Sequence, residues 1–470
     1  MSSHDIGIIG MGVMGKNLAC NIANTGYKVS VFNRSYNKTM KKLFKKPIER
    51  LFPYLAIKDF INSLRKPRCV MLMIQSGNPV DELIHTLLSY LCSGDLIIDG
   101  GNSFYLDTVK RFHFLQKKSI QFLGVGISGG SEGALKGPSI MPGGTIEAYE
   151  LVAPIFKNIS AKYHKEECVE YLGPDGAGHY VKMVHNGIEY SDMQLIAETY
   201  SLLKNLVGMN NIELSNIFEY WNKGELCSYL IEITGNILRK QDEDGNFIID
   251  YILDSASNKG TGIWTAKSGL DLYAPCSVIT ESVFARYLSS CKANRMIAST
   301  ILSGPKIFKI SNLDKEKFIK DIRKALFLGK IISYAQGFGL MKKASECYSW
   351  NLSFSKIAKI FRSGCIIRAN LLNNIAEAYS ENNDLIDLLF TPIFRDIINR
   401  YHLSLRNIIG MAVCNGISVP VFSAALSYYD AYRTVNSSAN LIQAQRDYFG
   451  SHTYHRIDQS GIFHTDWLDK

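Results

Sequence analysis

The segment KMVHNGIEY carries five functional side chains at spacings that an α-helix brings to one face. Lys182, His185, Asn186, Glu189 and Tyr190 stand at offsets 0, 3, 4, 7 and 8, and residues three and four apart are neighbours on a helix surface. The five include an ammonium group and a carboxylate, which can serve as base and acid. A lysine in a partly desolvated cleft has a lowered pKa and can accept a proton. A solvated polar face or a plain ion pair is the alternative, but the flanking apolar residues favour a buried helix.

A glycine-rich turn near the N-terminus follows a strand pattern and opens a helix. Its residues are Gly10, Met11, Gly12, Val13, Met14 and Gly15. Glycines at this spacing allow a tight turn, a close approach of the backbone to a pyrophosphate, and close packing of helix on strand, while the helix N-terminus faces the phosphates. The order of strand, glycines, helix and second strand predicts a dinucleotide site. The alternative is a turn that binds nothing.

The end of the second predicted strand indicates which dinucleotide binds. An NAD enzyme would place Asp or Glu there to bind the ribose 2′-hydroxyl, whereas this chain has Asn33, Arg34 and Ser35. The guanidinium of Arg34 can bind a 2′-phosphate in bidentate fashion, although it could also be a solvated loop residue. The sequence therefore predicts NADP as the cofactor.

Strand ends and loops supply further candidates, each of which could equally be structural. The small residues of GISGG leave backbone N–H groups free for a carboxylate, and the basic, glycine-rich loop NKGTGIW suits a phosphate. The candidates from these and neighbouring segments are Asn102, Ser128, Gly129, Gly130, Lys259, Thr261, Arg286, Arg446 and His452. His452 and His455 have no partner cluster that would complete a metal site, so no metal is predicted.

The elements that must position these groups change in kind along the chain. Up to about residue 175, short apolar runs alternate with helical segments, which indicates a parallel sheet covered on both faces. The expected strands are Asp5–Ile9, Tyr27–Phe32, Cys69–Ile74, Leu96–Asp99, Gln121–Val125 and Val169–Leu172. After the glycine-rich break at 173–179, helical periods dominate. We expect an α/β Rossmann-like domain over 1–178, a large all-α domain over 179–436, and a C-terminal tail over 437–470 that docks on another surface.

Composition narrows the class of protein. The 470 residues are 46% hydrophobic and 20% charged, which is typical of a globular chain too long for one core. The net charge of +9 suits an anionic partner such as a phosphorylated metabolite or is a surplus without function, and no strongly basic run favours nucleic-acid binding. Ten cysteines without a C-x-x-C pair predict reduced thiols and a cytoplasmic protein, and the N-terminus has no signal-peptide pattern.

One stretch imitates a membrane span. No charged residue lies between Arg406 and Asp430, but NGISVP interrupts the stretch and is typical of a turn. A span needs roughly 20 unbroken apolar residues. The sequence therefore predicts two buried helices that meet at a turn.

Taken together, these segments resemble the 6-phosphogluconate dehydrogenase family over essentially the whole chain. The matching motifs are GMGVMG, FNRS, DGGNS, GISGGSEGA, GPSIMPGG, KMVHNGIEYSDMQ, ILDSASNKGTGIWT and QAQRDYFGSHTYHR. The lysine helix and the ILDSASNKGTGIWT loop are specific, whereas the glycine fingerprint alone is not. The resemblance implies oxidation of 6-phosphogluconate to ribulose 5-phosphate and CO2 with reduction of NADP, in the pentose phosphate pathway and gluconate utilization.

The resemblance also implies roles for the candidate residues. Lys182 would take the 3-hydroxyl proton and later polarise the ketone, and Glu189 would protonate C1. The residues implied to orient the sugar hydroxyls and the nicotinamide are Asn102, His185 and Asn186. The implied carboxylate site is Ser128, Gly129 and Gly130, and the implied phosphate site is Tyr190, Lys259, Thr261 and Arg286. Arg446 and His452 would enter the neighbouring subunit of a homodimer with exchanged tails.

Two departures and two alternatives stay open at this point. The family commonly has Lys near the nicotinamide where this chain has Gln75, and the tail ends in an altered FHTDWLDK. One alternative is a related β-hydroxyacid dehydrogenase that does not decarboxylate, against which Glu189, Lys259, Arg286 and Arg446 argue. The other is a non-enzymatic protein that binds NADP or nucleic acid, which would not need an acid–base pair on the lysine helix.

Overall fold

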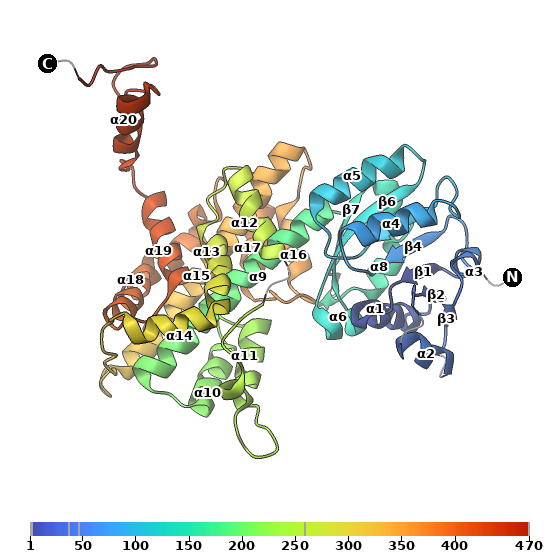
Figure 1. Cartoon of the computed structure of the whole chain (residues 1–470), viewed down its shortest axis with the longest axis horizontal. Coiled ribbons are helices and arrows are strands. Elements are labelled where there is room, and N and C mark those ends of the chain that lie inside the picture. The colour runs from blue at the N-terminus through green and yellow to red at the C-terminus, as the bar shows by residue number, and fades with distance from the viewer. Residues whose placement is uncertain (1–2, 36–37, 46–47, 258–259, 469–470) are drawn as a thin grey trace. The chain divides into compact units, whose positions relative to one another are not determined.

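The chain divides into two compact units, residues 1–425 and residues 426–470. The computed structural model describes residues 3–35, 38–45, 48–257 and 260–468. The larger unit contains a seven-stranded sheet followed by a helical region (Figure 1), so the predicted Rossmann-like fold with a large helical part is confirmed. The domain limits predicted at residues 178 and 436 stay a prediction.

The sheet has the strand order β3-β2-β1-β4-β5-β6-β7. Its strands are β1 (Ile6–Ile9), β2 (Val29–Phe32), β3 (Leu51–Tyr54), β4 (Cys69–Leu72), β5 (Leu96–Asp99), β6 (Gln121–Ser128) and β7 (Ser139–Gly144). Strands β1 to β6 pair in parallel, whereas β7 is antiparallel to β6. The chain order reverses between β1 and β4, and ligands of such sheets bind outside the carboxyl ends of the strands at this switch point.

Two apolar clusters bury the two faces of the sheet. Ile6 and Ile8 pack with helices α1 (Val13–Asn24) and α8 (Ala153–Ile159) on one face. Ile9 belongs to the opposite cluster, whose helices are α3 (Ile57–Asn62), α4 (Asn78–Leu87) and α5 (Tyr105–Gln116). Burial on both faces explains why the strands are continuous apolar runs.

The strand predictions require three corrections. The sequence pattern missed β3 and β7, which are the edge strands and contain Pro53 and Pro142; proline lacks the ladder N–H and is tolerated mainly at edges, so it hides a strand from pattern analysis. The predicted strand Val169–Leu172 is wrong, because only Val169 forms an isolated bridge, to Ile140. The sheet is mixed rather than wholly parallel, since β7 runs antiparallel.

The other helices complete the α/β part and build the helical region. In the α/β part these are α2 (Lys38–Lys45), α6 (Gly130–Lys136) and α7 (Ile146–Glu150), and a small hairpin joins β8 (Lys162–Tyr163) to β9 (Glu166–Glu167). The helical region contains α9 (Ala177–Leu202), α10 (Asn211–Trp221), α11 (Tyr229–Arg239), α12 (Thr261–Asp271), α13 (Ser277–Ser290), α14 (Lys292–Ile301), α15 (Lys315–Tyr348), α16 (Phe354–Phe361), α17 (Leu371–Glu381), α18 (Pro392–Cys414) and α19 (Pro420–Tyr432). Short π- and 3-10-helical turns lie at Leu203–Val207, Ile248–Tyr251 and Leu388–Phe390.

The uncharged stretch folds as the sequence predicts. It forms the end of α18 and the start of α19, which meet at the turn that begins with Asn415 and Gly416. Within the described ranges, no helix has the length and apolar character that crossing a membrane requires.

Helix α9 joins the sheet to the helical region. It packs on β6 and β7 and, further along, on α12, α13 and α15. Glycines make the crossing close: a Cβ at Gly178 would lie 2.3 Å from the carbonyl oxygen of Met141 and 2.5 Å from that of Gly124. A Cβ at Gly126 would lie 2.4 Å from the Cβ of Lys182. Because these glycines have no side chains, the backbones of β6 and α9 approach closely, and Lys182 lies against the sheet.

The second unit is ordered around one carboxylate. Its helix α20 (Ala439–Gly450) carries Asp447, whose side chain is fully buried. Asp447 accepts hydrogen bonds from the backbone N–H groups of Thr453 and Thr465 and from the indole of Trp467, at 2.9, 3.0 and 2.9 Å. These bonds fold the last residues back onto α20, so this segment is no floppy tail.

The close packing of α9 on the sheet at Gly178 predicts how a substitution there changes the stability of the protein. We expect Gly178→Ala to lower the unfolding free energy by about 1–3 kcal/mol, because the new methyl group meets backbone atoms that cannot rotate away. The matched control is Gly339→Ala in α15, where a Cβ would have no neighbour within 4 Å; alanine there should stabilise the helix by about 0.5–1 kcal/mol. Urea midpoints of the two variants would be compared with the parent, and a harmless Gly178→Ala would contradict the close crossing.

Candidate active site

Lys182 is a buried amine whose hydrogen-bond partners are uncharged side chains. Its residue is 6% exposed, and its Nζ donates a hydrogen bond of 2.8 Å to Oδ1 of Asn186 and lies 3.4 Å from Nδ1 of His185. Burial lowers the pKa of Lys182, and the charge of nearby Glu189 only partly opposes this. The neutral, proton-accepting form of the amine is therefore available at lower pH than in an ordinary lysine.

His185 separates the amine from the carboxylate of Glu189. The imidazole is fully buried, packs edge-on against Phe361, and places Nε2 3.2 Å from Oγ of Ser128. Burial, and then the charge of Lys182, hold the pKa of His185 well below its usual value, so the ring is neutral. Its Nδ1 lies 3.9 Å from Oε2 of Glu189, whose side chain is 22% exposed. The amine is thus enclosed, while the carboxylate lies nearer to solvent.

The GISGG turn lies beside this cluster, at the end of β6. Ser128 ends the strand and contacts His185. Gly129 and Gly130 follow with φ of +116° and +62°, which glycine adopts without strain. A Cβ at Gly129 would lie 2.6 Å from the carbonyl oxygen of Gly364. This turn therefore needs glycine both for its conformation and for its packing.

The predicted phosphate residues gather further along α9. The guanidinium of Arg286, from α13, lies 3.4 Å from the centre of the Tyr190 ring. A Cβ at Gly262 would lie 2.6 Å from the same ring, so the first turn of α12, which begins at buried Thr261, packs against Tyr190. Lys259, predicted for the same site, lies outside the described residues.

A pocket of about 550 Å³ lies at the carboxyl ends of β1, β2 and β4. The predicted cofactor residues that line it are Gly10, Gly12, Asn33, Arg34, Ser35 and Gln75. Among the predicted residues that do not line it, Met11 and Gly15 are buried, Met14 is half-buried and Val13 is exposed. The lining thus combines glycine backbone with a cationic side chain at the end of β2.

The glycine turn is fixed by close contacts. Gly10 has a φ of +105°, and a Cβ there would lie 2.4 Å from the carbonyl oxygen of Met73. A Cβ at Gly15 would lie 2.0 Å from the carbonyl oxygen of Gly10, whereas one at Gly12 would have no neighbour within 4 Å. Asn33 accepts a hydrogen bond of 2.9 Å from the backbone N–H of Met11. The open space over Gly12 and the arginine at the strand end fit a phosphorylated dinucleotide.

Sequence analysis missed one wall of this pocket. The missed lining residues from α4 are Pro79, Glu82, Leu83 and Thr86, whose spacing of three and four residues marks one helix face. That spacing could have identified them, because the helix follows directly after β4. Phe361 and Cys365 near the lysine were also missed, and no local spacing identifies them, since they come from a distant segment.

The remaining predicted residues lie elsewhere. Asn102 is exposed in the turn between β5 and α5. Arg446 and His452 belong to the second compact unit, where Nη1 of Arg446 donates to Oε1 of Gln443 at 3.0 Å. Across the described residues, no group of three or more His, Cys, Asp or Glu side chains could hold a metal ion. All ten cysteines are free thiols.

Comparison with known proteins covers both parts of the chain. The family model for the NAD binding domain of 6-phosphogluconate dehydrogenase matches residues 5–173, and the model for the C-terminal domain of the same enzyme matches residues 178–467. A curated relative from Buchnera aphidicola subsp. Schizaphis graminum, named 6-phosphogluconate dehydrogenase, decarboxylating, is 59% identical over 100% of this chain and 99% of its own length. The Escherichia coli K12 protein of that name is 57% identical over all of both chains.

A solved structure agrees with these matches. Plasmodium falciparum 6-phosphogluconate dehydrogenase, solved in its apo form, with NADP+ and with 6-phosphogluconate, superposes with a TM-score of 0.95 at 44% identity. The match covers 98% of this chain and 100% of that one. With both family models, full-length relatives and the fold in agreement, the chain belongs to the 6-phosphogluconate dehydrogenase family.

Proposed function

We propose that this chain oxidises 6-phosphogluconate to ribulose 5-phosphate and CO2 with reduction of NADP, in the pentose phosphate pathway and gluconate utilization. The observation that carries the proposal is the enclosed amine of Lys182 on the same helix as the carboxylate of Glu189 and the ring of Tyr190, on which Arg286 of α13 stacks. A β-hydroxyacid dehydrogenase that does not decarboxylate would need only the lysine. The additional acid and the cationic, aromatic Tyr190–Arg286 pair favour a phosphorylated substrate that also loses CO2.

The dinucleotide pocket supports NADP as the cofactor. NADP bound there would supply the acceptor for the hydride that leaves C3 of the sugar acid. Arg34 lies in the pocket lining at the end of β2, where it can form charge-assisted hydrogen bonds to a 2′-phosphate. Gln75, in place of the lysine common in the family, provides an uncharged wall near the nicotinamide.

The first half of the reaction needs a base and then a hydrogen-bond donor at one atom. Neutral Lys182 takes the proton of the 3-hydroxyl as hydride leaves C3. The product is a 3-keto acid, in which the ketone is β to the carboxylate. The protonated Lys182 then donates a hydrogen bond to the ketone oxygen, which accepts the electron pair as the bond between C1 and C2 breaks and CO2 leaves.

The second half needs an acid. Loss of CO2 leaves an enediol, and Glu189 delivers a proton to its terminal carbon to give ribulose 5-phosphate. His185 and Asn186 hold Lys182 by hydrogen bonds and orient the sugar hydroxyls, and Asn102 positions the hydroxyls and the nicotinamide. Because His185 is neutral, it adds no charge that would compete with the acid.

The two ends of the substrate have separate binding groups. Backbone N–H groups of the turn formed by Ser128, Gly129 and Gly130 bind the carboxylate. The residues proposed to bind the phosphate are Tyr190, Lys259, Thr261 and Arg286. The stacking of Arg286 on Tyr190, with a hydrogen bond of 3.3 Å from Nη1 to the carbonyl oxygen of Ser257, keeps the guanidinium in a fixed orientation, where its charge can attract an anion.

We also propose that two copies of this chain associate into a homodimer. Large exposed apolar side chains lie on and after α14, namely Met296, Ile297, Ile301, Leu302 and Phe308, at 59% to 72% exposure. A cluster of this kind favours a protein–protein contact. The ordered tail would then bring Arg446 and His452 to the phosphate of the partner's substrate. Free cysteines throughout the chain are consistent with the reducing cytoplasm.

Removing the base should stop hydride transfer. We expect Lys182→Ala to reduce NADPH formation by roughly 10²–10⁴-fold, the usual effect of a general acid–base group, while NADP still binds. The parent protein should release one CO2 for each NADPH formed. Absorbance would measure NADPH, and gas evolution would measure CO2 in the same reaction. Lys204→Ala, at a half-buried lysine that pairs with Asp250 after the same helix, should keep its activity. Near-normal turnover of Lys182→Ala would refute the base assignment.

Removing the acid should act on a later step. We expect Glu189→Ala to slow ribulose 5-phosphate formation by roughly 10²-fold or more. Because the carboxylate acts only after CO2 has left, a single-turnover experiment should show a burst of NADPH that precedes the sugar product. Rapid-quench analysis would follow both species, and sugar formation at the parent rate would exclude the acid role.

The cofactor choice should depend on Arg34. We expect Arg34→Ala to lower kcat/KM for NADP by roughly 10–100-fold and to leave kcat/KM for NAD almost unchanged, because only NADP carries the phosphate that the guanidinium binds. Steady-state kinetics with both cofactors would measure the ratio. An unaltered preference for NADP would show that another group recognises the 2′-phosphate.

A further inference from the structure

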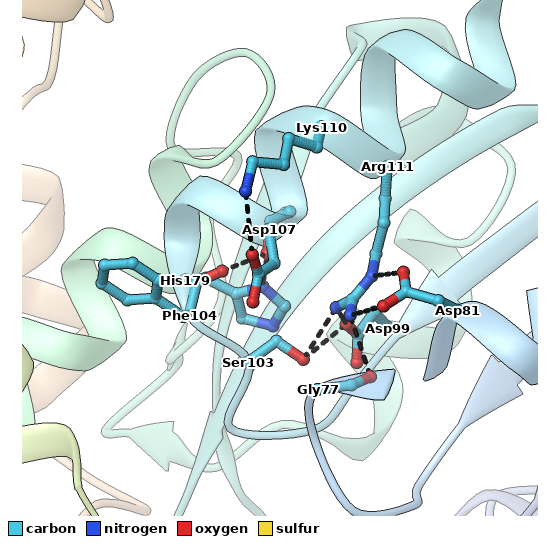
Figure 2. Close-up of polar contacts among 10 residues, drawn as sticks. Gly77, Asp81, Asp99, Ser103, Phe104, Asp107, Lys110, Arg111 and His179 are labelled. Carbon is cyan, nitrogen blue, oxygen red and sulfur yellow. Dashed lines mark hydrogen bonds and ion pairs between the residues drawn. The ribbon is translucent and has the colours of Figure 1, made fainter. Parts of the chain in front are cut away.

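All three guanidinium nitrogens of Arg111, on α5, contact residues of two separate segments of the chain (Figure 2). The side chain is 4% exposed. Its Nε and Nη2 donate to the two carboxylate oxygens of Asp81 at 2.6 and 2.9 Å, and Nη2 also donates to the carbonyl of Gly77 at 3.0 Å. Its Nη1 lies 3.3 Å from Oδ2 of Asp99 and 3.5 Å from Oγ of Ser103. Three nitrogens thus contact four residues from two segments.

One of these segments is the turn that carries Asn102. Asp99 ends β5, and its buried carboxylate accepts hydrogen bonds from Oγ of Ser103 at 2.6 Å and from the backbone N–H of Gly101 at 3.1 Å. The carboxylate therefore shapes the DGGNS turn from inside, with exposed Asn102 between the two anchored residues. Arg111 neutralises this buried carboxylate and fixes its position.

The other segment is the turn that leads into α4. Gly77 precedes the helix with a φ of +88°, and Asp81 lies in its first turn. Gln75 and Pro79, on either side of Gly77, line the dinucleotide pocket. Arg111 therefore links a wall of the cofactor pocket to the turn that carries Asn102.

The same helix also reaches the lysine helix. Thr108, one turn before Arg111 on α5, places Oγ1 2.7 Å from Nδ1 of His179. His179 is buried in α9, one turn before Lys182. Helix α5 therefore connects these regions. Through Thr108 it contacts the helix of the proposed base, and through Arg111 it binds the two turns that follow β4 and β5.

We propose that Arg111 is a positioning residue for hydride transfer, which holds the Gln75 and Asn102 turns in register with Lys182. The inference rests on the proposed roles of Asn102 and Lys182. Hydride transfer requires reacting atoms about 3–3.5 Å apart, and a misplacement of about 1 Å can cost roughly 10²-fold in rate. Lysine at this position would keep the charge but could not bridge two carboxylates with a planar fork.

A control is available at the opposite end of the same two strands. Arg68 precedes β4, and its Nη1 lies 3.1 Å from Oδ2 of Asp95, which precedes β5; the two side chains are 12% and 2% exposed. Asp95 also accepts hydrogen bonds from the backbone N–H groups of Arg68 and Cys92, at 2.7 and 2.9 Å. This pair joins the same two strands at their amino ends, away from the pocket residues. Arg68→Lys therefore replaces another arginine that pairs with a buried carboxylate, without touching the site.

The experiment compares Arg111→Lys and Arg68→Lys in the full chain. Steady-state rates would be measured with 6-phosphogluconate and with the substrate deuterated at C3, together with thermal midpoints. We expect Arg111→Lys to lower kcat by about 10–100-fold and to raise the primary isotope effect on kcat, while KM for the substrate changes less than kcat. Arg68→Lys should lower the thermal midpoint but keep the parental isotope effect. Equal kcat and equal isotope effects in the two variants would overturn the inference.

Two further variants keep the outcomes separate. If Arg111→Lys fails to fold, Ser103→Ala removes one hydrogen bond of the same turn and should raise the isotope effect in the same direction; a parental value would count against the inference. Asn102→Ala tests the proposed role of Asn102 itself. If Asn102→Ala impairs hydride transfer but Arg111→Lys keeps the parental isotope effect, only the positioning role of Arg111 is rejected. If Asn102→Ala transfers hydride at the parental rate, the proposed role of Asn102 is rejected.

Discussion

Desolvation of one amine is the constraint on which the site depends. Lys182 is enclosed with an amide and a neutral imidazole as its hydrogen-bond partners, and burial lowers its pKa. A charged ammonium in such a place is costly, so the group exists more readily as the neutral base that alcohol oxidation requires. In the proposed mechanism the same enclosure would make the protonated form a strong hydrogen-bond donor to the ketone, because electrostatic interactions are less screened there.

The fold creates this desolvation by a close crossing of a helix over a sheet. Glycines at 124, 126, 143 and 178 remove side chains from the crossing, so that the Cβ of Lys182 lies directly against β6. Gly187 and Gly337 let α12 and α15 approach the other sides of α9. The burial of α9 therefore depends on glycine on several surrounding elements, and this packing also excludes water from the amine.

The sequence predicted the parts of the fold that follow from local patterns. The glycine turn, the helix after it, the buried strands and the five side chains on the lysine helix all have regular spacings, and the structure contains that helix, five of the six predicted strands and a single helix, α9, that carries all five side chains. The edge strands were missed because Pro53 and Pro142 interrupt their pattern. Phe361 and Cys365 were missed for another reason: their contacts with the lysine helix join residues far apart in the chain, and no local spacing indicates such contacts.

Buried charged side chains also fix the turns at the end of the sheet, and the composition of the chain does not indicate this. Asp99 and Arg111 are charged residues at 1% and 4% exposure, and each would be costly if it were buried alone. Their mutual contact, together with Asp81, makes burial tolerable and orients two turns at the carboxyl end of the sheet. Helix α9 and the turns of the proposed cofactor site therefore share contacts with α5, which ties the position of the proposed base to that of the pocket.

The most direct test of the central claim is the titration of Lys182 itself. Protein labelled with 13C at lysine Cε would be titrated by NMR, and the Lys182 signal would be assigned by its absence from Lys182→Arg. The account predicts that this lysine loses its proton at clearly lower pH than the surface lysines of the same chain. Titration of Lys182 together with those surface lysines would contradict it.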